Sequence, residues 1–270
     1  MTLSPHHLQV LYQAYCNTHL LWKNADIKSL KQFNLSQVNT TTFIRTLDKQ
    51  LRLGQLAEQF AFNQMATCSA ITILAENIQI QNYKQTVGEL DALLLLNHLP
   101  IHLEIVYKFY LYDATLGPSE IECWIGPNRK DRLIDKLNKL TQKQFPLLFT
   151  NACQHTLKQL NLGHHNFEQQ VLFKAQLFVP YAHQIHCELL NKDCITGFYI
   201  NTEQLEQFKT HKFYIPIKLD WFIAPHKAVR WVNIAQFKIT SQVFIAQKRS
   251  PLIWIKSNTG KMSKAFLVWW

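Results

Sequence analysis

The chain has 270 residues, of which 47% are hydrophobic and 17% are charged. This balance excludes a disordered chain, and the length suffices for a buried core, in one large domain or two, without disulfides or metal staples. Only 7 glycines are present. Neither the G-x-G-x-x-G nor the G-x-x-x-x-G-K-[ST] motif occurs, so the glycine-signalled nucleotide sites are excluded.

Positive charge is concentrated in the second half of the chain. Lys and Arg total 28 against 18 Asp and Glu, which gives a net charge of +10. Residues 1–150 account for +2 of this charge, and residues 151–270 for +8. Such a skew favours a polyanionic partner, nucleic acid ahead of acidic lipid. A basic protein without such a partner is an equally good interpretation of charge alone.

Cysteine usage and apolar run lengths indicate the compartment. The 6 cysteines show no C-x-x-C spacing, and the N-terminus lacks the basic and apolar regions of a signal peptide. The longest apolar run, Ala92–Leu96, is far shorter than the ~18 residues of a membrane helix. We therefore expect a cytoplasmic protein with reduced thiols and no membrane partner.

In chain order, the pattern predicts helices over 5–22 and 47–68, then strands over 71–81, 86–96, 101–112 and 121–125. A helix over 128–145 follows, which Pro146 is expected to end. The rest favours strands over 171–179, 197–200, 213–217, 231–239, 242–247, 252–255 and 264–270. We expect an α/β (α+β) chain of two domains, residues 1–155 and a basic, aromatic, strand-rich domain over 156–270.

Acidic residues occur in apolar surroundings in three segments of the first half: Glu58, Glu89 with Asp91, and Glu104 with Lys108. Alternate strand residues share a face, so Glu89 lies with Asp91 and Glu104 with Lys108. If the two strands are neighbours, these carboxylates repel one another unless a cation joins them. Mg²⁺ (or Mn²⁺) held by Asp91 and Glu104 satisfies this requirement, with Lys108 assisting an attacking water and Glu58 and Glu89 accessory.

These residues carry a family resemblance. A helix Glu, then Gly-x-x-Asp, then Glu with a downstream Lys, then a basic helix resembles the PD-(D/E)XK nuclease superfamily. More closely, three segments resemble a bacterial family known as domain of unknown function 1853, over about residues 50–145: Gly88–Asp91, His102–Leu111 and Trp124–Leu133. The resemblance implies a restriction-endonuclease-like fold, a mixed sheet flanked by helices, with Asp91 and Glu104 as Mg²⁺ ligands. The superfamily usually has its lysine where Val106 stands, and Lys108 lies ~7 Å further along the strand.

The predicted helix after Asn128 has a basic face. Its basic side chains fall within an arc of about 80°, beside an apolar face. Such a ridge fits the phosphates of nucleic acid, although a solvated amphipathic helix has the same pattern. The residues are Arg129, Arg132, Lys136, Lys139 and Lys143.

We therefore predict a metal-dependent nuclease that hydrolyses phosphodiester bonds in DNA. Two alternatives remain: a catalytically inactive nuclease fold that binds nucleic acid, and an adaptor that docks to a protein partner through residues 267–270. In the second half, basic residues interleave with aromatic ones, which suits contact with phosphates and bases, although most of these rings are expected in the core. The set includes Lys218, Trp221, Trp231, Lys248, Arg249, Trp254, Trp269 and Trp270.

Overall fold

The computed structural model describes residues 3–23, 25–35, 42–47 and 49–270. The chain divides into two compact units, each built from separate stretches of sequence. Unit 1 contains Leu20–Tyr107 and Asp135–Lys174, and unit 2 contains Leu3–His19, Lys108–Ile134 and Ala175–Trp270. The boundary expected after residue 155 therefore falls inside unit 1.

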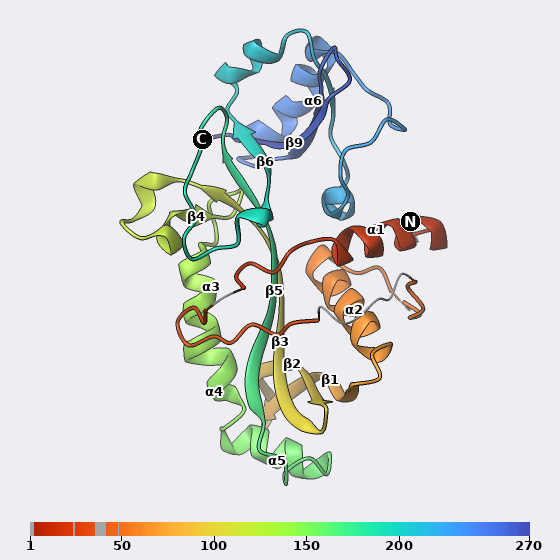
Figure 1. Cartoon of the computed structure of the whole chain (residues 1–270), viewed down its shortest axis with the longest axis vertical. Coiled ribbons are helices and arrows are strands. Elements are labelled where there is room, and N and C mark those ends of the chain that lie inside the picture. Colours follow the sequence, from red (N-terminus) through yellow and green to blue (C-terminus); the bar gives the residue numbers. More distant parts are fainter. Residues whose placement is uncertain (1–2, 24, 36–41, 48) are drawn as a thin grey trace. The chain divides into compact units, whose positions relative to one another are not determined.

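In the described residues, nine strands form one mixed sheet with helices beside it, which confirms the α/β class (Figure 1). The strand order is β1-β2-β3-β5-β6-β9-β8-β7, and β4 pairs with β3. Strand β5 pairs in parallel with β6, as does β6 with β9. The strands are β1 (Ile71–Asn82), β2 (Gln85–Leu96), β3 (Leu99–Tyr112), β4 (Trp124–Ile125), β5 (Glu168–Pro180), β6 (Ile195–Ile200), β7 (Lys212–Tyr214), β8 (Leu252–Lys256) and β9 (Met262–Leu267).

The first two helices are shorter than the sequence pattern predicts, and the last two lie where no helix is predicted. The helices are α1 (Pro5–Cys16), α2 (Leu53–Ala66), α3 (Leu133–Lys139), α4 (Phe145–Leu147), α5 (Asn151–Gln159) and α6 (Ile234–Ala246). Helix α1 begins where Ser4 accepts a hydrogen bond from His7 N at 3.2 Å, as expected for an N-cap followed by proline. It ends at Cys16 rather than at residue 22.

The core of unit 1 lies where β1 and β2 meet α4 and α5. Gly88 allows the closest approach, because a Cβ there would lie 2.5 Å from the Leu147 side chain. A larger residue at 88 would force the end of the Leu147 side chain to move. The buried side chains of this core include Ile78, Ile80, Leu90, Leu93, Leu147, Leu148, Cys153, Leu157, Leu162 and Phe167.

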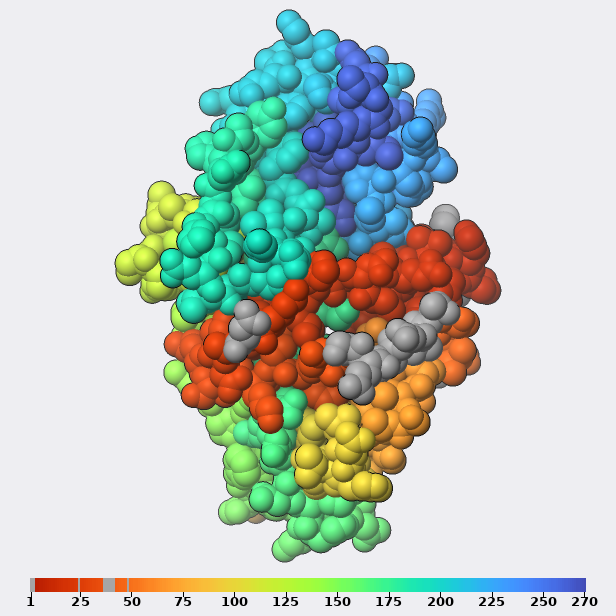
Figure 2. Space-filling model, viewed as in Figure 1, coloured from red at the N-terminus to blue at the C-terminus, as the bar shows by residue number. Residues whose placement is uncertain are grey.

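Residues 20–23 and 25–33 run along β5 within unit 1, and parts of them are visible on the surface in Figure 2. Leu21 N donates to Phe173 O at 2.8 Å, and Phe33 N donates to Val171 O at 2.9 Å. Strand β6 pairs only with the last part of β5, from Leu177 onward. The extended segment therefore uses backbone groups of β5 that would otherwise form an open edge.

The helix predicted over 128–145 is wrong in its extent. Helix α3 starts only at Leu133, a π-helical turn covers Leu140–Gln144, and α4 follows. Pro146 lies inside α4 and does not end the helix. Proline has no backbone N–H to donate, which is tolerated in the first turn of a helix, and Pro146 is the second residue of α4.

The strands predicted over 231–239 and 242–247 are also wrong, because α6 occupies this region. Asn233 caps the helix, accepting from Gln236 N at 3.0 Å. Two β-branched residues that favoured strand, Ile239 and Val243, lie on its exposed side at 72% and 59% exposure. The strand predicted over 121–125 is mostly a 3₁₀ turn, Glu120–Cys123, before β4.

Unit 2 has a core of its own. Strands β6, β7, β8 and β9 and helix α6 contribute to it, and the rings of Phe213 and Phe237 stack at 4.4 Å. Of the tryptophans that interleave with basic residues in this half, Trp221 and Trp254 are buried, and Trp231, Trp269 and Trp270 are half-buried. The other members of the core are Ile200, Leu205, Phe208, Ile253, Ile255, Ala265 and Leu267.

Candidate functional site

Strands β2 and β3 bring Asp91 and Glu104 together. Their antiparallel ladder ends at the pair Ala92–Leu103, and Asp91 and Glu104 are the next residue on each strand. Beyond that pair, the backbone N–H of Ile105 donates to the side chain of Asp91, at 2.7 Å from Oδ2, instead of to a backbone carbonyl of β2. Asp91 is therefore held at the backbone of the residue after Glu104. The predicted adjacency of these two strands is confirmed.

Glu104 is fully buried, at 0% exposure, and both of its oxygens accept hydrogen bonds. Oε1 faces His102 Nε2 at 3.3 Å, and Oε2 accepts from the Gln144 side-chain amide. Gln144 Oε1 in turn accepts from Lys136 Nζ at 2.8 Å. A chain of polar contacts thus links the buried carboxylate of β3 to the ammonium of α3.

His102 supports Glu104 as a neutral donor. Gln169 Nε2 donates to Phe145 O at 2.7 Å, so this atom is the amide nitrogen, and its second hydrogen faces His102 Nδ1 at 3.0 Å. Nδ1 is then the acceptor, and Nε2 carries the hydrogen that points to Glu104. Burial lowers the pKa of His102 to about 4, which keeps the imidazole neutral at neutral pH.

Four carboxyl groups, Glu58, Glu89, Asp91 and Glu104, form what we call the carboxylate cluster. Burial, then repulsion by Asp91, Glu89 and Glu104, raises the pKa of Glu58 to about 8. Burial and the charge of Glu104 raise the pKa of Asp91 to about 7. Burial also raises the pKa of Glu104 to about 7, against the opposing charge of Lys136. Glu58 and Asp91 are half-buried and Glu89 is exposed, so the cluster reaches from the interior to the surface.

The donor set of the cluster suits a hard divalent cation. Carboxylates from α2, β2 and β3 repel one another, and a cation bound to their oxygens would remove that repulsion. Asp91 and Glu104 are the pair that would hold it. Among the described residues, no group of three or more His, Cys, Asp and Glu side chains is arranged to hold a metal ion. Water would have to supply most of the coordination, as Mg²⁺ commonly allows.

Lys108, the lysine predicted to assist catalysis, belongs to unit 2. Its Nζ pairs with Asp131 Oδ2 at 2.7 Å, with both side chains partly exposed. The cation that acts on all three of Glu58, Asp91 and Glu104 is instead Lys136, which lowers the pKa of each, and Lys139 adds to this effect at Glu104. The sequence pattern places Lys136 on the basic face of the following helix, where it is expected to contact phosphates rather than carboxylates.

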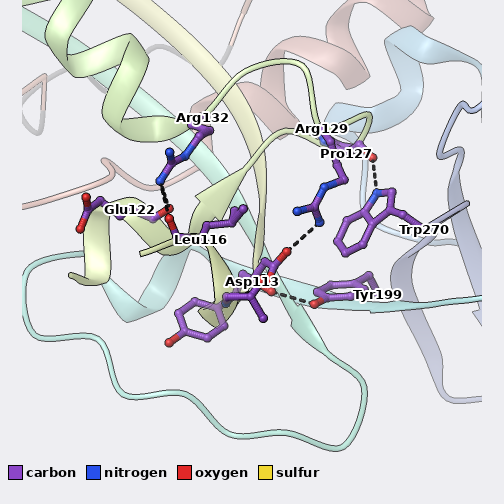
Figure 3. A network of polar contacts seen from close by, with 10 residues as sticks. Asp113, Leu116, Glu122, Pro127, Arg129, Arg132, Tyr199 and Trp270 are labelled. Atoms are coloured by element: carbon purple, nitrogen blue, oxygen red, sulfur yellow. Dashed lines mark hydrogen bonds and ion pairs between the residues drawn. The ribbon is translucent and has the colours of Figure 1, made fainter. Parts of the chain in front are cut away.

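Two members of the predicted basic ridge, Arg129 and Arg132, hold unit 2 together (Figure 3). Arg129 Nη1 pairs with Asp113 Oδ2 at 2.7 Å, and its guanidinium lies 4.4 Å from the centre of the Trp270 ring. Arg132 Nη2 donates to Leu116 O at 2.9 Å and to Glu122 O at 3.0 Å. Neither arginine lies on α3, so the five basic residues do not form one continuous helical face.

Lys139 and Lys143 are exposed on α3 and the π turn. With the half-buried Lys136, they are what remains of the predicted ridge, all within unit 1. The C-terminal residues proposed as a docking segment are packed within unit 2. Trp270 Nε1 donates to Pro127 O at 3.2 Å, and its ring lies 5.4 Å from that of Tyr199.

Arg129 provides a test of this structural role. We expect Arg129→Gln to lower the free energy of unfolding by about 1–3 kcal/mol, because Asp113 loses a charged hydrogen-bond partner and the Trp270 ring loses its cation. The measurement is chemical denaturation followed by tryptophan fluorescence. Lys130→Gln removes the same charge from the exposed neighbouring position and should change stability little. Equal stability of the two variants would refute the structural role.

None of the helices in the described stretches is long and apolar enough to cross a membrane. The fold defines the chain as a mixed α/β protein in which a strand pair presents buried carboxylates. The profile of the family described as "Domain of unknown function (DUF1853)" matches residues 1–268, so the chain belongs to that family. No curated protein and no solved structure matches the chain.

Proposed function

We propose that the chain is a metal-dependent phosphodiesterase of the PD-(D/E)XK kind that acts on nucleic acid, with DNA as its substrate. The observation that carries the proposal is the placement of Asp91 and Glu104 at the end of the β2–β3 ladder, where the charges of both act on the Glu58 carboxyl. Glu58 on α2, Asp91 on β2 and Glu104 on β3, followed by the lysines of α3, occur in the same order as in the motif of that superfamily. Fold likeness alone does not fix activity, so the residues must carry the proposal.

In this proposal Asp91 and Glu104 hold Mg²⁺ or Mn²⁺. When bound, the ion supplies charge stabilisation at the phosphorus and lowers the pKa of a water. Lys136 takes the part expected of Lys108, because its ammonium acts on the cluster and is joined to Glu104 through Gln144. It stabilises negative charge that develops beside the carboxylates. Glu58, with a pKa of about 8, accepts or returns a proton near neutral pH.

The proposed partner and compartment follow from charge and thiols. The net charge of +10, with Lys139 and Lys143 exposed beside Lys136, favours a polyanionic substrate. All six cysteines are free, which agrees with a reducing, cytoplasmic location.

The test is cleavage by the purified chain of single-stranded, duplex and branched DNA, with Mg²⁺, with Mn²⁺ and with a chelator. The proposal predicts metal-dependent products with at least one substrate that are missing with an Asp91→Ala control. Products of equal yield from Asp91→Ala, or none with any substrate, would contradict it.

One observation favours a catalytically inactive relative that binds nucleic acid. Glu104 has no exposed surface, and both its oxygens are already hydrogen-bonded. A buried carboxylate whose oxygens are both hydrogen-bonded fits a structural role as well as it fits a catalytic one. This alternative predicts salt-sensitive binding of DNA that neither a chelator nor Glu104→Gln alters.

A further inference from the structure

A second group of charged residues lies in unit 2, outside the carboxylate cluster of unit 1. It starts at the end of β3, where Lys108 pairs with Asp131 at 2.7 Å; their side chains are 36% and 45% exposed. The next residue, Phe109, turns its ring to the Trp221 ring in an edge-to-face contact at 5.3 Å. Both rings are buried, so they form a fixed base for the charged groups around them.

Lys218 lies on this aromatic base. Its Nζ is 3.1 Å from the centre of the Trp221 ring and 5.8 Å from that of Phe109. The two rings attract the ammonium through their negative faces and hold it near the end of β3. Lys218 begins the 3₁₀ turn Lys218–Phe222, which also carries Trp221, so ring and ammonium are positioned by the same short element.

Arg249 joins the group from the segment after α6. The following residue, Ser250, donates its backbone N–H to Asn128 Oδ1 at 2.8 Å. Asn128 belongs to the turn that carries Asp131, where Gly126 N donates to Asp131 O at 2.7 Å. Arg249 itself is exposed, and its backbone N–H donates to Phe244 O at 2.9 Å. Its guanidinium donates to Gln247 Oε1 at 3.4 Å and lies 5.6 Å from the centre of the Phe244 ring. From there its charge acts on Lys218, as do the charges of Lys108 and Asp131, so the four residues form one electrostatic group.

The charges of this group do not balance. Lys218 is exposed as a whole residue, but desolvation of its ammonium lowers its pKa to about 7, and Arg249 and Lys108 add to this effect while Asp131 opposes it. Within this electrostatic group, the one carboxylate of Asp131 pairs with Lys108 and is outnumbered by three basic side chains. Like charges held together are unfavourable, and an anion bound among them would relieve the repulsion. Arginine and lysine together supply the fork and the point charge that phosphate oxygens accept.

We propose that Lys108, Lys218 and Arg249, the basic group of unit 2, bind a phosphate of a nucleic-acid strand. This inference rests on the proposed function only in naming nucleic acid as the source of the phosphate. Because Trp221 and Phe109 are buried, the group contacts the backbone and not the bases, and binding is independent of sequence. Lys108 thereby belongs to substrate binding rather than to the chemical step.

The experiment is fluorescence anisotropy with a labelled single-stranded oligonucleotide in the presence of a chelator, so that cleavage plays no part. The double variant Lys218→Gln/Arg249→Gln should weaken binding at least about tenfold and reduce the slope of log affinity against log salt by about 1–2. Lys227→Gln/Arg230→Gln removes the same charge from exposed positions of unit 2 and should have a much smaller effect.

A third variant should change affinity in the opposite direction. Asp131→Asn removes the carboxylate that neutralises Lys108, so binding should tighten while the backbone hydrogen bond of residue 131 remains. Equal losses in the two double variants, or binding of acidic lipid vesicles without binding of the oligonucleotide, would overturn the inference. Binding that follows these predictions in a chain that cleaves no DNA would support the phosphate site and reject the nuclease.

Discussion

Replacing Asp91 by Asn is expected to reduce metal-dependent cleavage of DNA at least about 100-fold, a loss of about 2.7 kcal/mol of transition-state stabilisation. The substitution removes the negative charge of residue 91 and keeps its hydrogen bond. Asp91 accepts a hydrogen bond from Ile105 N, and the amide oxygen of Asn accepts the same bond. Glu104→Gln is a less clean change, because His102 and Gln144 both donate to Glu104 and the new amide group would meet a donor.

A matched control is available in the same unit. Asp135 is an exposed carboxylate on α3, outside the cluster, and Asp135→Asn should leave the cleavage rate unchanged. Rates are compared at saturating substrate with both variants shown to unfold at the wild-type temperature. Similar rates for wild type and Asp91→Asn would remove the catalytic role of the cluster.

Bound Mg²⁺ is expected to stabilise the chain more at about pH 8 than at about pH 6. The raised pKa values of Glu58, Asp91 and Glu104 mean that the folded chain binds more protons than the unfolded chain between about pH 4 and pH 8. Their contribution to stability is therefore fully present below about pH 4 and is lost as the pH rises through 7 to 8. A cation replaces the lost protons, and at a hundred times its Kd it adds about 2.7 kcal/mol.

Thermal unfolding with and without Mg²⁺ across this pH range measures the effect. Other groups titrate as well: the buried amine of Lys264, for example, has its pKa lowered to about 7. The informative quantity is thus the difference between wild type and Asp91→Asn, in which such contributions cancel. A Mg²⁺-induced rise in unfolding temperature that is the same in both proteins, or the same at both pH values, would argue against a metal site at the cluster.

The strands were predictable where each carries a strong local pattern. Strands β1, β2 and β3 lie within a few residues of their predicted limits, because β-rich runs are bounded by turn residues. Helix α6 was not predictable, since exposed Ile239 and Val243 imitate strand composition and the decisive signal is a single cap at Asn233. The π turn before Pro146 depends on packing, which no local pattern displays.

The acidic residues of the candidate site were predictable from the sequence. Its glutamines and its lysine were not. Alternation along two strands was enough to place Asp91 beside Glu104. Gln144 and Gln169 gave no signal, because a glutamine on an amphipathic helix or at a strand end is usually solvated. The choice of Lys136 over Lys108 depends on where Asp131 lies, and that contact joins residues 23 positions apart.

Binding of Mn²⁺, followed by its electron paramagnetic resonance signal, tests most directly whether the carboxylates of β2 and β3 form a cation site. The wild-type chain should bind the ion saturably at one class of site, and Asp91→Asn should weaken this binding at least about tenfold. Absence of saturable binding by the wild-type chain, or undiminished binding by Asp91→Asn, would contradict the account.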